Sequence, residues 1–263
     1  MNTDYKNWVP KGRVYGCIAG AAVLLICLIV FGVAGIAVSG TLRWIICAVF
    51  AVAFIVLAIY SVWCVIAYNA FSYDGKRQLS RGIVEGTSKY INLPKGGKGL
   101  DIGCGSGALT IACSKRNPRG TMLGIDYWGK EYASFSKALC EKNAAAEGVS
   151  NTSFTKGNAI KLEFPDESFD AVTSNYVYHN ITGTDKQALL LESLRVLKKG
   201  GCFAIHDIMS QRRYGDMQAF AEKLRATGYE KVELIDTTGG MFMSKTESRI
   251  LMLGGSTLLV GSK

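Results

Sequence analysis

Two long segments without a single charged residue most constrain what this chain can fold into. They span residues 14–38 and 44–68. A helix of about 25 residues is roughly 37 Å long, which is enough to cross a hydrocarbon core of about 30 Å. A signal peptide would be shorter, and a second apolar run would not follow it almost at once. The sequence therefore predicts a membrane anchor over residues 1–70, with one transmembrane helix in each run.

The short connection between the two runs makes the helices antiparallel neighbours. Basic residues flank the outer ends, whereas the connection holds Arg43 alone; the flanking residues are Lys6, Lys11, Arg13, Lys76, Arg77 and Arg81. Because Lys and Arg favour the cytoplasmic side, we expect both termini and the soluble domain in the cytosol, at the cytoplasmic membrane of a prokaryote. Gly16 and Gly20 form a GxxxG pair, which is a candidate dimer contact between transmembrane helices.

The remaining residues have the mixed composition of one soluble domain. Residues 71–98 read as a linker with an amphipathic helix over 76–90, and 99–263 as the main domain. There, predicted strands (99–103, 121–126, 152–156, 169–174, 202–207, 231–236, 256–260) alternate with predicted helices (108–115, 132–147, 185–197, 216–226). This order predicts an α/β fold with a Rossmann-like, doubly wound, mostly parallel seven-stranded sheet, preceded by the helical hairpin.

Composition excludes several function classes. The eight cysteines form no CxxC pair and no Cys/His cluster with metal-ligand spacing, so we expect no metal site. Four of them lie in the apolar runs, and free thiols fit a reducing compartment. The net charge is +9, but no dense Lys/Arg block occurs in the soluble part. Such a surface tolerates anionic lipid headgroups, and nucleic-acid binding is not indicated.

The sharpest motif is LDIGCGSG at residues 100–107, between a predicted strand and a predicted helix. Glycines let a backbone turn tightly and approach a ligand where a Cβ atom would clash. The spacing is GxGxG, whereas a dinucleotide-binding loop would read GxGxxG. A nicotinamide-dependent oxidoreductase is therefore disfavoured.

With this motif, residues 78–263 resemble a class I S-adenosylmethionine-dependent methyltransferase of the small-molecule branch. The Pro165–Asp170 stretch and the LKKGG turn at 197–201 follow the same family pattern in the same order. The resemblance implies S-adenosyl-L-methionine as the cofactor. It also implies that the methionine part is held by the acidic residue and loop of the first motif, namely Asp101, Gly103, Cys104, Gly105 and Gly107.

Further cofactor residues follow the next two strands. Asp126 ends the second strand, where a carboxylate can accept from both ribose hydroxyls. Tyr127 and Trp128 come next, and we expect one of them to pack on the adenine ring, with core packing as the alternative. Gly157-Asn158-Ala159 stands where the family usually has Gly-Asp-Ala. The amide of Asn158 can still accept or donate a hydrogen bond, so the departure affects the strength of adenine binding.

Candidate acceptor-side residues cluster where the fourth and fifth strands end. They are Asn175, Tyr176, Tyr178, His179, His206 and Asp207. We take His179, Tyr178 and His206 as candidate catalytic residues, and we count Asn175 with the cofactor residues. Histidine is the side chain best suited to move protons near neutrality, although a histidine at a strand end can also be purely structural. Methyl transfer needs a base only if the acceptor must lose a proton.

The resulting hypothesis is a membrane-anchored methyltransferase that transfers a methyl group by in-line displacement to a small or lipophilic acceptor. The alternative is a protein that binds S-adenosylmethionine as a sensor or scaffold without turnover. Within the long connection 236–255, Met241–Met243 could form an apolar wall of the acceptor pocket.

Overall fold

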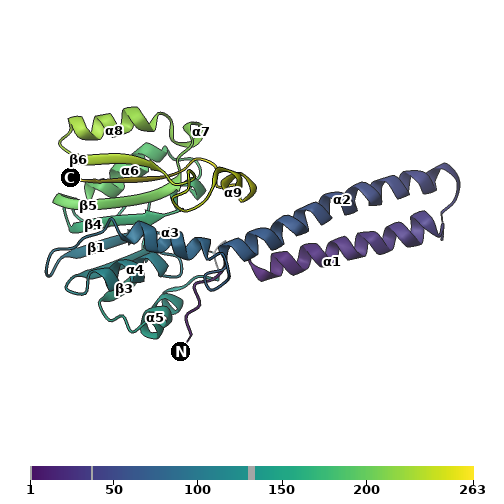
Figure 1. Cartoon of the computed structure of the whole chain (residues 1–263), viewed down its shortest axis with the longest axis horizontal. Helices are drawn as coiled ribbons and strands as arrows, with labels where there is room; N and C mark the ends of the chain where they lie inside the picture. The colour runs from purple at the N-terminus through teal and green to yellow at the C-terminus, as the bar shows by residue number, and fades with distance from the viewer. Residues whose placement is uncertain (1, 37, 130–133) are drawn as a thin grey trace. The chain divides into compact units, whose positions relative to one another are not determined.

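The structure is a computed structural model that describes residues 2–36, 38–129 and 134–263 (Figure 1). The chain divides into two compact units. Residues 7–80 form one unit, and residues 2–6 join residues 81–263 in the other. The segment that precedes the apolar helices therefore belongs to the soluble unit, although the hairpin separates the two in sequence.

The first unit is an antiparallel helical hairpin. Helix α1 spans Lys11–Cys27 and continues as a π-helical segment, Leu28–Val33, while α2 spans Gly40–Phe71. The spans Lys11–Val33 and Gly40–Phe71 have 23 and 32 residues and mean hydropathies of 2.8 and 2.9, so each is long and apolar enough to cross a membrane. Phe31 near the end of the first stacks on Phe50 near the start of the second, at 6.3 Å between ring centroids.

The second helix begins earlier than residue 44, the start expected from the charge-free run. Arg43 lies inside α2, where its Nε donates to the carbonyl of Gly32 at 2.6 Å and its guanidinium also bonds the carbonyl of Val33. These carbonyls end the first helix and lack intrahelical partners. Arg43 is accommodated at the turn because it satisfies them.

Gly20 of the GxxxG pair is used within the hairpin. A Cβ atom at Gly20 would lie 2.9 Å from Cδ2 of Leu57 on α2, whereas one at Gly16 would meet nothing within 4 Å. The lack of a side chain at Gly20 therefore allows α1 to pack closely against α2 within one chain. This contact does not support the expected dimer.

The second unit contains the predicted seven-stranded sheet, in the order β3-β2-β1-β4-β5-β7-β6. Only β7 runs antiparallel to its neighbours β5 and β6. The strands are β1 Lys98–Ile102, β2 Thr121–Asp126, β3 Thr152–Lys156, β4 Phe169–Asn175, β5 Leu197–Ile208, β6 Glu230–Asp236 and β7 Ser256–Ser262. The fold is thus Rossmann-like and mostly parallel, as expected.

Helices cover both faces of this sheet (Figure 1). Apolar residues of α6 (Lys186–Arg195) and α8 (Met217–Ala226) pack on one face, and those of α3 (Leu79–Ser88) and α4 (Ala108–Arg116) on the other. The remaining helices are α5 (Lys137–Ala146), α7 (Gln211–Tyr214), α9 (Lys245–Ile250) and a 3-10 turn, Tyr178–Asn180. The two covered faces leave the carboxyl edge of the parallel strands as the place for a site.

Several element boundaries differ from expectation by a few residues, and two of the differences have a local cause. The helix expected over 132–147 begins at Lys137, behind a Ser136 cap that accepts from Leu139 N at 3.2 Å; residues 132 and 133 lie outside the described residues. The turn expected at Gly200-Gly201 is absorbed into β5, because Leu197 pairs with Phe169 before the register shifts.

Candidate active site

The glycine loop connects β1 to α4 at the carboxyl edge of the sheet. Its backbone takes positive φ angles at Gly103 and Gly105, of 74° and 55°. A Cβ atom at Gly103 would lie 2.3 Å from Cγ2 of Val177, so this position admits no side chain. A Cβ atom at Gly105 would meet nothing within 4 Å, which leaves open space beside the loop.

Asp126 holds this loop from the end of β2. Its Oδ2 accepts from Gly105 N at 2.9 Å, and its Oδ1 accepts from Trp128 N at 2.8 Å. The Trp128 indole in turn donates to the carbonyl of Gly105 at 3.1 Å. The Asp126 carboxylate is only half-buried, and an ionised carboxylate offers about four lone-pair sites, so it retains capacity for further donors.

These features fit the cofactor that the family resemblance implies. The open side of Gly105 admits a close backbone approach, and the remaining lone pairs of Asp126 match the two ribose hydroxyls of S-adenosylmethionine. Trp128 rather than Tyr127 contacts the loop. Tyr127 is 63% exposed, and its ring lies 5.1 Å from Nζ of Lys156.

Asp101 lies beneath the loop and is buried. Its Oδ2 accepts from the Thr110 hydroxyl at 2.6 Å, which ties β1 to α4. Burial raises the pKa of Asp101 to about 7, against the lowering effect of the Thr110 bond. Its direct contact with the cofactor stays a prediction, since the structure shows its carboxylate bonded to Thr110.

The Asn158 segment lies beside Asp126, because Gly157 N donates to the Asp126 carbonyl at 3.0 Å. Asn158 is exposed, and its Oδ1 accepts from Ile160 N at 2.9 Å. That bond fixes the amide in a local turn and leaves its NH₂ as the group to donate to a ligand ring. A role of Asn158 and Ala159 in adenine binding stays a prediction.

His179 and Asp207 form a bonded pair across the ends of β4 and β5. Nδ1 of His179 lies 2.6 Å from Oδ1 of Asp207, and the backbone N–H of His179 donates to Oδ2 at 3.2 Å. Ile208 N also donates to Asp207, at 2.7 Å. Burial by itself would raise the pKa of Asp207, but the bonds from His179 and Ile208 outweigh it and hold that pKa below its usual value.

This arrangement fixes the tautomer of His179. An ionised Asp207 only accepts hydrogen bonds, so in the neutral imidazole Nδ1 carries the proton and Nε2 has the lone pair. The His179 side chain is 17% exposed, whereas that of Asp207 is fully buried. An imidazole held by a buried carboxylate, with its second nitrogen partly accessible, can act as a general base.

His206 does not fit the catalytic role expected from the sequence. It is fully buried, its Nδ1 lies 2.9 Å from Oδ1 of Asn175, and its Nε2 lies 2.9 Å from the Thr237 hydroxyl. Burial lowers the pKa of His206 to about 3, although nearby Asp207 acts in the opposite direction. His206 therefore stays neutral near pH 7 and serves as a structural link between Asn175 and Thr237.

Tyr178 is also placed differently from expectation. It is fully buried in the apolar core, where its hydroxyl lies 2.6 Å from Oγ of Ser193. Ser193 already donates to the Leu189 carbonyl at 2.9 Å, so Tyr178 is the donor to Ser193. Burial raises the pKa of Tyr178 well above its usual value. This side chain cannot touch an acceptor, and the 3-10 turn explains why: it points residue 178 inward and residue 179 outward.

Aromatic rings surround His179 and His206. The Tyr176 ring centroid lies 5.9 Å from that of His179 and 4.6 Å from that of His206. The Phe242 ring lies 5.5 Å from His206, and a Cβ atom at Gly86 of α3 would come within 2.2 Å of Phe242. Phe242 therefore packs between α3 and the end of β5.

The sequence analysis did not identify Thr110 or Thr237 as site residues. Thr110 bonds Asp101 and Thr237 bonds His206, and both contacts join segments that are distant in the sequence.

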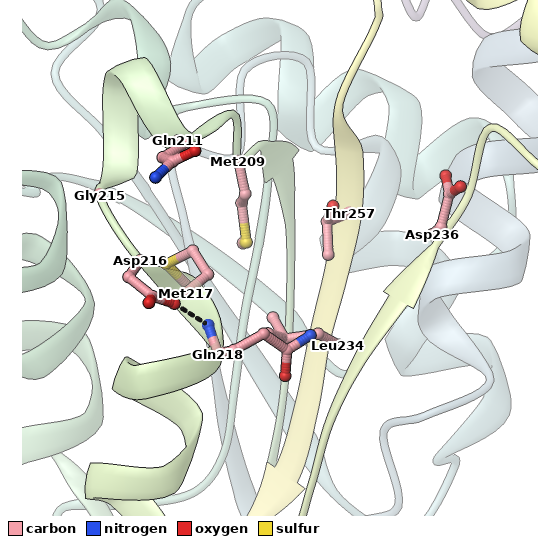
Figure 2. A pocket seen from close by; sticks show the side chains of 9 residues that line it. All are labelled: Met209, Gln211, Gly215, Asp216, Met217, Gln218, Leu234, Asp236 and Thr257. Carbon is pink, nitrogen blue, oxygen red and sulfur yellow. Dashed lines mark hydrogen bonds between the residues drawn. The ribbon is translucent and has the colours of Figure 1, made fainter.

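An open pocket of about 460 Å³ lies beside α7, α8, β6 and β7 (Figure 2). Its lining includes Met209, Leu234 and Asp236, and none of the predicted cofactor or acceptor residues. Asp216 in its wall caps α8 by accepting from Gln218 N at 2.9 Å (Figure 2). The chemistry described above therefore lies outside this pocket.

Comparison with known proteins gives matches in the soluble unit. Residues 100–205 match a family described as a methyltransferase domain. The demethylmenaquinone methyltransferase of Geobacillus stearothermophilus is 29% identical over 170 residues, which cover 60% of this chain and 70% of the relative. The enzyme of the same name from Geobacillus sp. (strain WCH70) is 35% identical over 121 residues, 44% of this chain and 47% of the relative.

Solved structures share the fold at low sequence identity. The [4+2]-cyclase SpnF superimposes with a TM-score of 0.55 at 18% identity, covering 73% of this chain and 85% of SpnF. A geranyl diphosphate C-methyltransferase from Streptomyces coelicolor A3(2) gives a TM-score of 0.54 at 14% identity, covering 74% and 83%. At these identities the likeness concerns the fold alone, and the first example carries a different reaction on it.

Proposed function

We propose that this chain, which carries an S-adenosylmethionine-dependent methyltransferase domain of the small-molecule type, methylates a lipophilic acceptor that must lose a proton. Two observations support an apolar acceptor. Relatives are named for demethylmenaquinone, and two helices of this chain are apolar and long enough to cross a membrane. A quinol-like ring is apolar and also carries a weakly acidic hydroxyl, so it has both properties that the proposal requires of the acceptor.

The observation that carries the proposal is the His179–Asp207 pair. Methyl transfer to a neutral amine or thiolate needs no dedicated base, whereas a weakly acidic hydroxyl or ring carbon gains from one. Asp207 is buried, ionised and bonded to Nδ1 of His179, which leaves Nε2 able to receive a proton. A buried ionised carboxylate of this kind is costly to maintain, and a function at His179 accounts for it.

Two groups of residues at the carboxyl edge of the sheet have different roles in the proposed reaction, one on the cofactor and one on the acceptor. When bound, S-adenosylmethionine supplies a methyl group on a positively charged sulfur. The glycine loop and Asp126 hold the cofactor side, and His179 takes the acceptor proton at Nε2. Asp207 stabilises the imidazolium that results. The apolar rings of Tyr176 and Phe242 lie nearby and limit the access of water to the acceptor side.

We also propose that both termini and the catalytic domain lie in the cytosol. The flanking Lys and Arg residues outnumber Arg43 in the connection. Residues 2–6 and 81–263 form one compact unit, which supports an even number of crossings between them. An enzyme fused at Lys263 that works only in the cytosol should be active, and activity on the opposite side of the membrane would overturn this topology.

The proposed reaction can be tested with the full chain in lipid nanodiscs. The protein is incubated with methyl-labelled S-adenosylmethionine and a bacterial lipid extract, and labelled products are identified by mass spectrometry. We expect label in an isoprenoid quinone or a similar apolar compound. His179→Gln should lower turnover by about 10²–10⁴-fold at unchanged cofactor affinity.

Two results would contradict the proposal. Equal turnover by the His179→Gln variant would remove the base from the mechanism. Tight cofactor binding without label in any compound of the apolar or aqueous extract would favour the sensor or scaffold alternative.

A further inference from the structure

The first residues of the chain are clamped onto helix α5. The backbone N–H of Asp4 donates to Oδ1 of Asn143 at 2.7 Å, and Nδ2 of Asn143 donates back to the Asp4 carbonyl at 3.0 Å. The Tyr5 side chain is buried, and its hydroxyl donates to Glu147 at 3.1 Å. Residues 2–6, which we call the N-terminal arm, are thereby fixed to the soluble unit.

The same contacts reach the glycine loop. Nδ2 of Asn143 also donates to the Ser106 carbonyl at 3.0 Å, and the Ser106 hydroxyl donates to the Tyr5 carbonyl at 2.9 Å. Asn143 is fully buried, and its three bonds use both amide hydrogens and its oxygen. The arm, Asn143 and Ser106 thus form a closed ring of hydrogen bonds.

Ser106 lies directly between Gly105 and Gly107 of the loop. Its neighbour Gly105 donates its N–H to Asp126, the residue that fits the ribose. A glycine-rich segment loses more conformational freedom on ordering than any other, so contacts that order it in advance favour ligand binding. The arm supplies one of these contacts directly, from the Tyr5 carbonyl to the Ser106 hydroxyl, and holds Asn143, which supplies a second to the Ser106 carbonyl.

We propose that the N-terminal arm is a positioning element of the cofactor site, acting through Ser106 and Asn143 on the glycine loop. The arm precedes the first apolar helix and the glycine loop follows the second, so the loop is ordered by residues from both sides of the hairpin. Cofactor affinity then depends on a segment that the methyltransferase domain itself does not contain. The proposal rests on the cofactor site and not on the identity of the acceptor.

The test uses the full chain in nanodiscs and needs no acceptor. Tyr5→Ala removes the buried anchor of the arm, and Ser106→Ala removes the hydroxyl that bonds it. The dissociation constants of S-adenosylmethionine and S-adenosylhomocysteine are measured by calorimetry, and hydrogen exchange of residues 103–108 is measured without ligand. Lys137→Ala, at an exposed position of α5, is the matched control.

We expect each variant to bind the cofactor about three- to tenfold more weakly and to exchange faster in the loop, whereas the control stays unchanged. The double variant should be little worse than either single one, because both act on the same ring of bonds. If Tyr5→Ala does not fold, Tyr5→Phe, which keeps the ring and removes the hydroxyl that bonds Glu147, takes its place beside Ser106→Ala.

Unchanged affinity and unchanged loop exchange, with an arm that itself exchanges freely, would overturn the proposal. Strictly additive losses in the double variant would also overturn it, since arm and loop would then act separately. Failure of the acceptor hypothesis would alter neither measurement.

Discussion

The two parts of the carboxyl edge each contain a buried aspartate, and the pKa values of the two acids are shifted in opposite directions. Asp101, on the cofactor side, has the Thr110 hydroxyl as its side-chain donor, and burial raises its pKa to about 7. Asp207, on the acceptor side, accepts from the His179 ring and two backbone N–H groups, and its pKa is lowered. Burial is similar in both cases, so the donors decide which acid stays ionised.

The two histidines also differ in their surroundings. His179 is partly exposed and paired with a carboxylate, whereas His206 is buried and bonds the neutral side chains of Asn175 and Thr237, and burial lowers its pKa to about 3. Proximity to the site therefore does not make a residue a proton carrier. The edge combines the His179–Asp207 pair, which we propose as the base, with a second histidine that links Asn175 to Thr237.

The largest expected effect comes from Asp207→Asn. A neutral amide no longer requires Nδ1 of His179 to be the donor, so the base loses its fixed tautomer and its counter-charge. We expect turnover to fall by about 10²–10⁴-fold with cofactor affinity unchanged. Steady-state kinetics with the acceptor found by mass spectrometry, together with calorimetry, measures both. A comparable loss of cofactor affinity would show that Asp207 acts in cofactor binding and not on the acceptor side.

Asp126→Ala tests the cofactor side. We expect S-adenosylmethionine binding to weaken by about 2–4 kcal/mol, because two ribose hydroxyls lose a charged acceptor and the glycine loop loses a bond from Gly105. Asp236→Ala, at an exposed carboxylate outside the site, is the control. An unchanged dissociation constant in a folded Asp126→Ala protein would remove this residue from the cofactor site.

The pH dependence of stability should separate Asp101 from His206. The folded pKa of Asp101, about 7, lies above its unfolded value of 3.8, so the folded state binds the extra proton and Asp101 makes stability fall as pH rises between about 4 and 7. His206 has a folded pKa of about 3 against 6.5, so it makes stability rise with pH between about 3 and 6.5. The two contributions oppose each other over the shared range.

Melting temperatures of the ligand-free protein between pH 5 and 8 measure this balance. Asp101→Asn should become more stable relative to the unaltered protein as pH rises, with a slope of at most about 1.4 kcal/mol per pH unit. A stability difference independent of pH would mean that Asp101 is ionised in the folded state, like Asp207.

The smallest expected effect concerns the segment Met241–Met243. Met241 is 41% exposed, whereas Met243 is 2% exposed. If the segment borders the acceptor, Met241→Ser should raise the KM for a lipophilic acceptor by about two- to fivefold and leave the melting temperature unchanged. Met243→Ser, at the buried position, should lower the melting temperature instead. Equal KM values for Met241→Ser and the unaltered protein would exclude Met241 from the acceptor wall.

Local patterns predicted most of the fold. The strand at 121–126 and the strand at 152–156 have the expected bounds, and β7 begins at Ser256 as expected. Alternating apolar segments and turn residues are local, so they can be read without knowledge of distant contacts. The prediction was less accurate at Gly200-Gly201, where pairing of β5 with β4 extended the strand beyond what its own sequence indicates.

The sequence by itself determined the two apolar helices, the order of strands and helices, and the glycine loop with Asp126 at the next strand end, because composition and spacing along the chain encode them. Only the tertiary structure decided that Tyr178 is a core residue, that His179 pairs with Asp207, and that Tyr5 bonds Ser106. These outcomes depend on contacts between residues far apart in the sequence and on how one short turn orients neighbouring side chains. Burial and hydrogen-bond partners, which exist only after folding, assign a charge and a role to each residue type.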